Sequence, residues 1–244
     1  MMKRVVLFSL AVLLIAPCAW AKTIVVAGDA TWPPMELVDD NKQMTGFGIE
    51  YVRAAAKEAG FEVEFKNVAW DGIFAGLEAG KYDAICSSVT ITDERKATMD
   101  FSIPYLKVRQ ALVVPKDSTA KSLEDMKGKT VGAQISTTGH FAVKKVEGVN
   151  AKSYDEIGLA MEDLFNGRID GVVCDDPVAS LYALQKADYA AKLKVAAVLE
   201  TGDELYGVAV KKGNKVVLDL LNKGIEAVQA KGIDKELRKK WMGQ

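Results

Sequence analysis

The chain has 244 residues, of which 49% are hydrophobic and 27% are charged, and its formal net charge is −1. A chain of this length can bury a core as one large domain or as two lobes. The near-neutral charge, without a basic tract, argues against nucleic acid as a partner. The single histidine and the scattered cysteines do not form a zinc-binding pattern, so we expect no metal.

The first 21 residues have the pattern of a cleavable export signal. Lys3 and Arg4 precede an apolar run over residues 5–15, and a small-x-small motif ends at Ala21. The apolar run is shorter than the roughly 20 residues that a membrane-spanning helix needs. We therefore expect cleavage after Ala21, a mature chain that begins at Lys22, and a periplasmic location.

Beyond the export signal, strand-like apolar runs alternate with helical patterns. The sequence predicts strands over residues 23–27, 62–68, 83–86, 110–114, 130–134, 151–154, 171–174 and 206–210. It predicts helices over residues 47–60, 71–80, 122–128, 139–146, 155–167, 215–232 and 234–242. Strands that alternate with helices in this way indicate an α/β fold with parallel sheets covered on both faces.

Two stretches repeat one unit, a buried strand followed by a polar turn into a helix. They are DAICSSVTITDERK, which starts at Asp83, and GVVCDDPVAS, which starts at Gly171. In open α/β sheets, ligands bind beyond the carboxyl ends of the strands. Two lobes that face each other across a cleft would therefore bring both polar turns to one ligand.

Arg95 follows a cluster of hydroxyl groups in the first of these units. Ser87, Ser88 and Thr90 lie at the end of the strand, and Arg95 belongs to the short helix that comes next. The planar guanidinium can bind a carboxylate through two hydrogen bonds, which a lysine does less well. The alternative interpretation is a solvated helix residue, like Lys96 beside it.

Tryptophans occur in two of the loops that follow strands. Trp32 comes shortly after Asp29 and directly before two prolines, and Trp70 lies at another corner between a strand and a helix. Two indoles at such positions can sandwich the apolar or cationic body of a ligand. The alternative is that both belong to the hydrophobic core.

A third polar turn follows the strand that ends at Gln134. Ser136, Thr137 and Thr138 are ordinary candidates for capping the next helix. A helix N-terminus is also a natural site for an anionic group. Thr137 and Thr138 are therefore candidate ligand-binding residues as well as caps.

The adjacent acids Asp175 and Asp176 need a reason, because unpaired charge at the end of a buried strand is costly. Asp176 precedes Pro177, which predicts an N-cap with proline at the first helical position. Asp175 is the last residue of the strand and would point into the cleft. Cys86 and Cys174 also end apolar strands, and the tendency of free cysteine to be buried predicts two free thiols.

Taken together, several stretches resemble the bacterial solute-binding proteins, family 3, the periplasmic amino-acid-binding proteins of ABC importers. These stretches are TITDERKATMDFSIPY, VGAQISTTG, the double-proline loop and GIDKELRKKWMG. The resemblance implies a type II periplasmic binding protein, in which two Rossmann-like lobes with mixed, mostly parallel sheets are joined by two hinge strands. Residues 22–109 and 206–244 would form lobe 1 and residues 110–205 lobe 2, with hinge crossings near 108–112 and 201–206.

The same resemblance implies how the backbone groups of a free amino acid are bound. Arg95 would bind the α-carboxylate, helped by Thr90 and by the backbone around Thr138. Asp175 would bind the α-ammonium, with Ser88 nearby. Both charges need partners, because a buried charge that loses its partner costs roughly 3–5 kcal/mol.

The ligand side chain would lie among five further matched residues. Trp32 and Trp70 would contact its body, and Asp29, Ser87 and Gln134 would bind its distal polar end. Two aromatic faces and one acid favour a cationic ligand, so arginine or another basic amino acid is the first choice. Glutamine is the second choice, and dicarboxylic ligands are disfavoured because the matched positions hold no second arginine.

The implied function is capture of a free L-amino acid by hinge closure and its delivery to an inner-membrane ABC permease. We expect a monomer without a cofactor and without catalytic residues. One alternative is an exported cyclohexadienyl (prephenate/arogenate) dehydratase-like enzyme on the same scaffold, although a single histidine argues against a histidine-based triad. The other is a ligand carrier for a chemosensory receptor.

Overall fold

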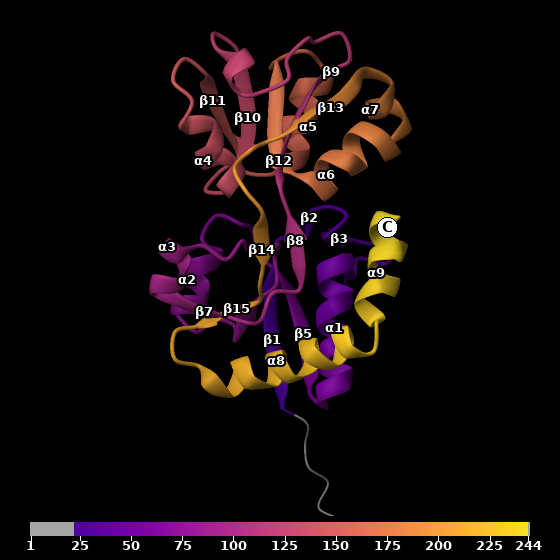
Figure 1. Ribbon diagram of the computed structural model, residues 1–244. Coiled ribbons are helices and arrows are strands. Elements are labelled where there is room, and N and C mark those ends of the chain that lie inside the picture. The colour runs from indigo at the N-terminus through magenta and orange to yellow at the C-terminus, as the bar shows by residue number, and fades with distance from the viewer. Residues whose placement is uncertain (1–21, 244) are drawn as a thin grey trace, which may run out of the picture.

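The structure, a computed structural model, describes residues 22–243 and consists of two α/β lobes joined at a narrow waist (Figure 1). The export signal predicted over residues 1–21 lies outside the described residues. Each lobe has its own five-stranded sheet. Within residues 22–243, no helix is both long enough and apolar enough to cross a membrane.

Lobe 1 is built on a sheet with the strand order β5-β1-β6-β15-β7. Its strands are β1 (Thr23–Gly28), β5 (Glu62–Asn67), β6 (Ala84–Ile85), β7 (Met99–Phe101) and β15 (Ala209–Lys211). Strand β1 is parallel to β5 and β6, whereas β15 is antiparallel to both of its neighbours and so runs against the rest of the sheet. Its helices are α1 (Phe47–Ala59), α2 (Ile73–Glu78), α3 (Asp93–Thr98), α8 (Lys215–Ala230) and α9 (Ile233–Met242).

Helices α1, α8 and α9 pack together on one side of lobe 1, and α2 and α3 lie on the other (Figure 1). In α1, Phe47, Tyr51 and Ala55 recur at helical spacing and are buried. The helix ends as predicted at Gly60, which adopts the left-handed conformation with a φ of 79°. The buried residues of α1 pack in the same core cluster as Val26 of β1 and Cys86, which follows β6.

Lobe 2 is built on a second sheet with the strand order β11-β10-β12-β9-β13. Its strands are β9 (Gln110–Pro115), β10 (Thr130–Gln134), β11 (Asn150–Tyr154), β12 (Gly171–Asp175) and β13 (Leu193–Val198). Here β9 is the strand that runs against the other four. Its helical segments are η1 (Glu124–Met126), α4 (Thr138–Lys144), α5 (Ile157–Phe165), α6 (Asp176–Ser180), the π-helical turn η2 (Leu181–Gln185) and α7 (Ala187–Lys192).

Alternate residues of strand β12 enter two different cores. Val172 and Cys174 pack in the cluster that contains Ile157 of α5, whereas Val173 packs in the cluster that contains Val143 of α4. Both faces of the sheet are therefore covered, as the apolar strands predicted. The two mixed sheets, each with a single reversed strand, confirm the predicted fold class.

Two strands cross the waist and pair with each other. Strand β8 (Leu106–Val108) is antiparallel to β14 (Glu204–Tyr206), β8 leads directly into β9, and β13 leads into β14 (Figure 1). Both crossings fall within or beside the predicted spans 108–112 and 201–206. The hinge strands therefore carry side chains into the region between the lobes.

Short elements account for most differences between the predicted and observed structure. Strands β2 (Thr31–Trp32), β3 (Glu36–Val38) and β4 (Met44–Thr45) form a small sheet that the sequence did not predict. The helix predicted over 122–128 is wrong, since this segment forms only the turn η1. Ser122 and Asp125 bond each other's side chains and backbone there, and such local bonds compete with a regular helix.

Cys86 and Cys174 are buried free thiols, as predicted. Cys86 follows β6 in lobe 1, and Cys174 lies in β12 of lobe 2. Burial raises the pKa of both thiols well above the usual value. The thiols are therefore protonated core residues, and they leave the two lobes free to move relative to each other.

Candidate ligand-binding site

The candidate residues meet between the lobes, at the carboxyl ends of strands from both sheets. Those of lobe 1 follow β1, β5 and β6, and those of lobe 2 lie at the ends of β10 and β12 or directly after β10. Most are buried: Asp29, Trp32, Trp70, Ser87, Ser88, Thr90, Gln134 and Asp175 are each less than 9% exposed. The structure thus brings together residues that are as far apart in the sequence as Asp29 and Asp175.

A small cavity holds the group of residues that was matched to the ligand side chain. It is lined by Asp29, Trp32, Trp70, Ser87, Ser88, Gln134 and Thr137. Asp29 accepts hydrogen bonds from the Thr31 backbone and hydroxyl, and its own backbone N–H donates to Ser87 Oγ at 2.9 Å. The indole N–H of Trp32 has no hydrogen-bond partner among the described residues. This cavity therefore combines aromatic walls, one buried carboxylate and one spare donor.

Three hydrogen bonds join lobe 1 to residues 134–136 of lobe 2. Gln134 Nε2 donates to Asp29 Oδ2 at 3.0 Å, and Trp70 Nε1 donates to the carbonyl of Ile135 at 2.9 Å. The third runs from Arg95 Nη2 to the carbonyl of Ser136 at 3.3 Å. The structure is therefore a closed form in which the two lobes are in direct contact.

Arg95 lies in the cleft rather than on a solvated helix face. Its guanidinium donates to the carbonyl of Thr90 at 2.9 Å and lies 5.5 Å from the centre of the Trp70 ring. Burial lowers the pKa of Arg95, although a guanidinium stays charged at neutral pH. Lys96, in contrast, is exposed and forms a surface ion pair with Asp93 at 2.7 Å. A fixed, half-buried cation in the cleft is suited to an anionic group.

Asp175 is a buried carboxylate held by one side chain of β9 and one of the hinge strand β14. Gln110 Nε2 and the Tyr206 hydroxyl both donate to it. Burial raises the pKa of Asp175 to about 7, and the negative charge of Glu204 contributes in the same direction. A cation that binds here would restore the charged form of Asp175.

Asp176 does not have the predicted role. The helix α6 begins at Asp176 itself, and the side chain of the geometric N-cap residue, Asp175, makes no capping hydrogen bond. Asp176 instead accepts a hydrogen bond from the backbone N–H of Arg109 at 3.1 Å, and its own N–H donates to the Arg109 carbonyl at 2.8 Å. Asp176 therefore connects the start of α6 to Arg109, which lies between the hinge strand β8 and β9.

Thr137 is an N-cap, as one interpretation of its turn predicted. Its hydroxyl accepts from the backbone N–H of His140 at 3.1 Å and donates to the carbonyl of Gln134 at 2.7 Å. Thr138 has a different environment, because its hydroxyl accepts from Gln110 Nε2 at 3.1 Å and donates to Glu204. Thr138 thus faces the cleft, while Thr137 shapes the turn and lines the cavity.

Four site residues were not predicted from the sequence: Glu36, Gln110, Glu204 and Tyr206. Glu36 is fully buried and accepts from the hydroxyl of Ser88 at 2.9 Å, and burial raises the pKa of Glu36 well above its usual value. Gln110 is a polar residue in an otherwise apolar strand, which is a usable signal for a buried polar contact. The other two lie on β14, whose path into the cleft is visible only in the folded chain.

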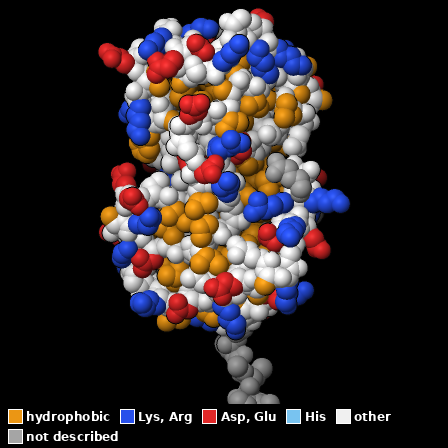
Figure 2. Space-filling model, viewed as in Figure 1, with side chains coloured by type: hydrophobic (Ala, Val, Ile, Leu, Met, Phe, Trp, Pro, Cys, Tyr) orange, Lys and Arg blue, Asp and Glu red, His pale blue; other side chains and the backbone are white. Residues whose placement is uncertain are grey.

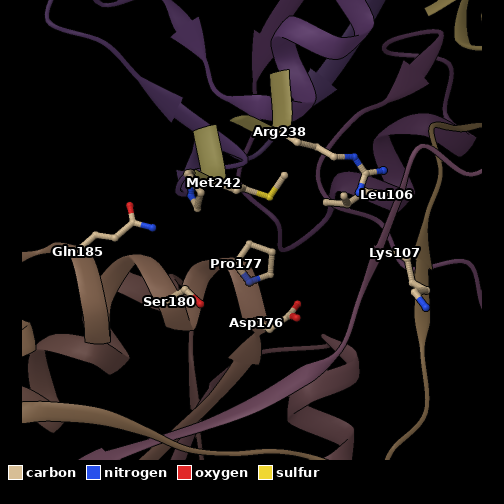
Figure 3. A pocket seen from close by; sticks show the side chains of 9 residues that line it. Leu106, Lys107, Asp176, Pro177, Ser180, Gln185, Arg238 and Met242 are labelled. Carbon is tan, nitrogen blue, oxygen red and sulfur yellow. The ribbon is translucent and has the colours of Figure 1, made fainter. Parts of the chain in front are cut away.

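A second cavity lies beside the hinge, between α6 of lobe 2 and α9 of lobe 1 (Figure 3). The side chains of Pro177 and Met242 face each other across it. Its lining consists of Pro34, Leu106, Lys107, Asp176, Pro177, Ser180, Gln185, Arg238 and Met242. Because it shares no residue with the candidate set, it is separate from the ligand site. In the part of the chain that the structure describes, no cluster of three or more His, Cys, Asp or Glu residues could hold a metal ion.

The fold and the cleft define a two-lobed solute-binding protein of the type II periplasmic binding protein architecture. A family model described as "Bacterial extracellular solute-binding proteins, family 3" matches residues 24–244, and the chain belongs to this family. The curated relatives are named as binding proteins rather than enzymes, which agrees with the expectation of a non-enzyme.

Individual relatives cover most of the chain. A probable histidine-binding protein of Neisseria gonorrhoeae is 35% identical over 211 residues, which are 85% of this chain and 78% of that protein. The ABC transporter arginine-binding protein 1 of Escherichia coli K12 is 33% identical over 248 residues and covers both chains fully. Among solved structures, an ancestral arginine-binding protein bound to arginine has a TM-score of 0.85 and 40% identity, over 91% of this chain and 99% of the other.

Proposed function

We propose that this protein binds a free polar amino acid, with arginine or another basic amino acid as the first choice and glutamine as the second, and delivers it to an ABC permease. The observation that carries the proposal is a buried carboxylate, Asp29, in a cavity walled by Trp32 and Trp70. Aromatic faces attract cations, and a carboxylate in a dry cavity does so more strongly. The arginine- and histidine-binding relatives support a cationic ligand.

The proposed roles of the remaining residues follow from their charges and hydrogen-bonding groups. Arg95, Thr90 and Thr138 would bind the α-carboxylate, and Asp175 and Ser88 would bind the α-ammonium. Ser87 and Gln134 would assist Asp29 at the distal end of the side chain, with Thr137 beside them in the cavity wall. A zwitterion would then find an opposite charge for each of its own, as burial requires.

Hinge closure would couple binding to transport. Thr90 and Arg95 belong to lobe 1, whereas Thr138 and Asp175 belong to lobe 2. A ligand biases a closed form only through contacts that differ between the open and closed forms, and contacts to both lobes meet this condition. The proposed boundaries of the lobes are residues 22–109 with 206–244, and residues 110–205.

We further propose that the chain is cleaved after Ala21 and works in the periplasm as a monomer that does not bind nucleic acid. Acidic and basic side chains are mixed over both lobes on the face shown in Figure 2, which fits a protein without a nucleic-acid surface. N-terminal sequencing of protein from a periplasmic extract tests the cleavage. A mature chain that begins anywhere other than Lys22 would contradict it.

Calorimetry or thermal shift with each of the twenty amino acids tests the ligand. The protein is first unfolded, freed of ligand and refolded, since a carried-over ligand would mask binding. We expect arginine to give the largest stabilisation, because a ligand that binds the native state raises the melting temperature. A larger shift with glutamine would reverse the order of the two choices. If no amino acid shifts the transition, the proposed function is wrong.

A further inference from the structure

Glu204 lies in the part of the cleft that the proposed function assigns to the ligand carboxylate. Its Oε2 atom accepts hydrogen bonds from the hydroxyls of Thr90 and Thr138, both at 2.8 Å. One hydroxyl comes from lobe 1 and the other from lobe 2. A single carboxylate oxygen of the protein therefore links Thr90 and Thr138, the two residues that would help Arg95 to bind an amino-acid carboxylate.

The electrostatic environment of Glu204 is also that of a bound carboxylate. Burial has the largest effect on the pKa of Arg95 and lowers it. The negative charge of Glu204 has the next largest effect, and it raises this pKa by favouring the charged guanidinium. The same negative charge adds to the effect of burial on Asp175, and so raises the pKa of that acid. Glu204 thus interacts with both residues that would bind the charged groups of the ligand. Its interaction with Arg95 is favourable, and its interaction with Asp175 is unfavourable.

The backbone of the hinge holds Glu204 in this place. Glu204 is paired with Val108 in the two-stranded hinge sheet, and Thr90 forms a β-bridge with Tyr206 of the same strand. The Ile91 N–H also donates to the carbonyl of Leu205 at 2.8 Å. Because its main chain is fixed beside Thr90, Glu204 can leave the site only by rotation of its side chain.

An open groove next to the site can receive the rotated side chain. Glu204, Arg95 and Thr138 lie along its lining, which also includes Lys144 and Lys145 of the α4 end. Both lysines are exposed, so a carboxylate that turned outward would exchange two hydroxyl donors for water and nearby positive charge. Departure from the site is therefore feasible without unfolding of the hinge.

We propose that Glu204 is an internal competitor of the ligand: it occupies the carboxylate site in the closed form and must be displaced by the amino acid. This inference rests on the proposed function for the roles of Thr90 and Thr138. When Glu204 occupies the site, the amino acid can bind only those molecules in which the site is free. The apparent affinity for the amino acid is reduced by that fraction. Glu204 would thereby stabilise a closed form without ligand and set an upper limit on affinity.

Small-angle scattering and calorimetry on Glu204→Ala test the two consequences. Without ligand, the variant should have a larger radius of gyration than the wild type, because the link between Thr90 and Thr138 is lost. It should also bind arginine and glutamine about threefold or more tightly, since no internal group competes. The control is Asp203→Asn, which removes a neighbouring exposed acid paired with Lys107 at 2.9 Å and should change neither value.

The outcomes separate this inference from the proposed function. Weaker binding of both amino acids by Glu204→Ala would make Glu204 a ligand contact and overturn the inference, as would unchanged affinity with an unchanged radius. The same gain in Asp203→Asn would show a general charge effect and overturn it too. If the wild type binds no amino acid, the proposed function fails, while the ligand-free scattering comparison still decides whether Glu204 holds the lobes together.

Discussion

The polar residues of the cleft reach it by two routes, from the ends of buried strands and from the hinge. Arg95 and Asp175 follow buried strands in recognisable motifs, so their charge and position could be inferred from the sequence alone. Gln110 instead enters the site from β9, and Glu204 and Tyr206 enter it from the hinge strand β14. Their contacts depend on how two distant strands pair across the waist, and local patterns do not contain that information. The first group was predicted and the second was found only in the structure.

Substitution of either charged residue should weaken ligand binding strongly. We expect Arg95→Ala and Asp175→Asn each to reduce amino-acid affinity by at least about 2 kcal/mol, because each leaves the opposite charge of a buried ligand unpaired. Calorimetry with the tightest-binding amino acid measures the loss. Lys96→Ala is the matched control for Arg95, since Lys96 is in the same helix but pairs only with exposed Asp93. Near-wild-type affinity would remove the substituted residue from the site.

Amino-acid affinity should depend on pH through Asp175. Burial raises the pKa of Asp175 to about 7, in surroundings that include Tyr206, Gln110, Glu204 and Asp176. Only the ionised form attracts an ammonium, so affinity should rise by up to about tenfold per pH unit as pH approaches 7 and then level off. Isothermal calorimetry between pH 5 and pH 8 measures this slope.

The raised pKa of Asp175 also affects the stability of the ligand-free fold, which should fall with rising pH while the ligand affinity rises. The folded pKa of Asp175 lies above its ordinary value near 4, so the folded state holds a proton that the unfolded state loses. Its contribution to the free energy of unfolding should therefore fall as pH rises from about 4 to 7. Asp175→Asn should remove both dependences. An affinity that is flat in the wild type over this range would contradict the assignment of Asp175 to the ammonium.

At the scale of elements, the long helices and most sheet strands were predictable, whereas β13 (Leu193–Val198) and several short elements were not. Helix α1 and strand β10 have enough residues to show a period, and both were predicted close to their observed limits. Strands β2, β3 and β4 have two or three residues each, which is too short for any periodicity. They exist because tertiary contacts hold them, and β2 and β3 carry the site residues Trp32 and Glu36.

The contact between α1 and α8 gives a prediction about packing. A Cβ at Gly224 of α8 would overlap the carbonyl oxygen of Ala55, so the backbones would have to separate. Gly224→Ala should therefore lower the free energy of unfolding by roughly 1–3 kcal/mol, as overpacking does, despite the better helix propensity of alanine. Urea denaturation followed by circular dichroism measures the change.

Gly158 of α5 provides the control for this substitution. The nearest atom to a Cβ there is Tyr182 Oη at 3.4 Å, which is an ordinary contact. Gly158→Ala should be neutral or stabilising by up to about 1 kcal/mol, because it adds helix propensity without a clash. Equal effects at the two positions would show that the close approach of α8 to α1 does not limit the size of residue 224.

At the scale of the whole molecule, closure depends on a few bonds between lobes that otherwise have separate sheets. The two-lobe architecture was predicted from the resemblance to family 3 solute-binding proteins, and the repeated strand-and-turn units fit it. The hydrogen-bond partners across the cleft could not be predicted, because their pairing depends on the relative orientation of the two lobes. Gln134 with Asp29 and Trp70 with Ile135 are such pairs. Both lie at the end of the site proposed for the ligand side chain, so they would stabilise the same closed form that the ligand selects.

Trp70→Phe tests this link between closure and affinity. The substitution keeps an aromatic ring in the cavity wall but removes the Nε1 donor that reaches the Ile135 carbonyl at 2.9 Å. Loss of one such bond should destabilise the closed form by about 1 kcal/mol and weaken amino-acid binding roughly fivefold. Trp241→Phe is the control, because Trp241 Nε1 donates to Glu50 at 3.0 Å within lobe 1. That variant should lower the melting temperature without a change in affinity, whereas equal affinity losses in both variants would mean that the bond across the cleft has no special part in binding.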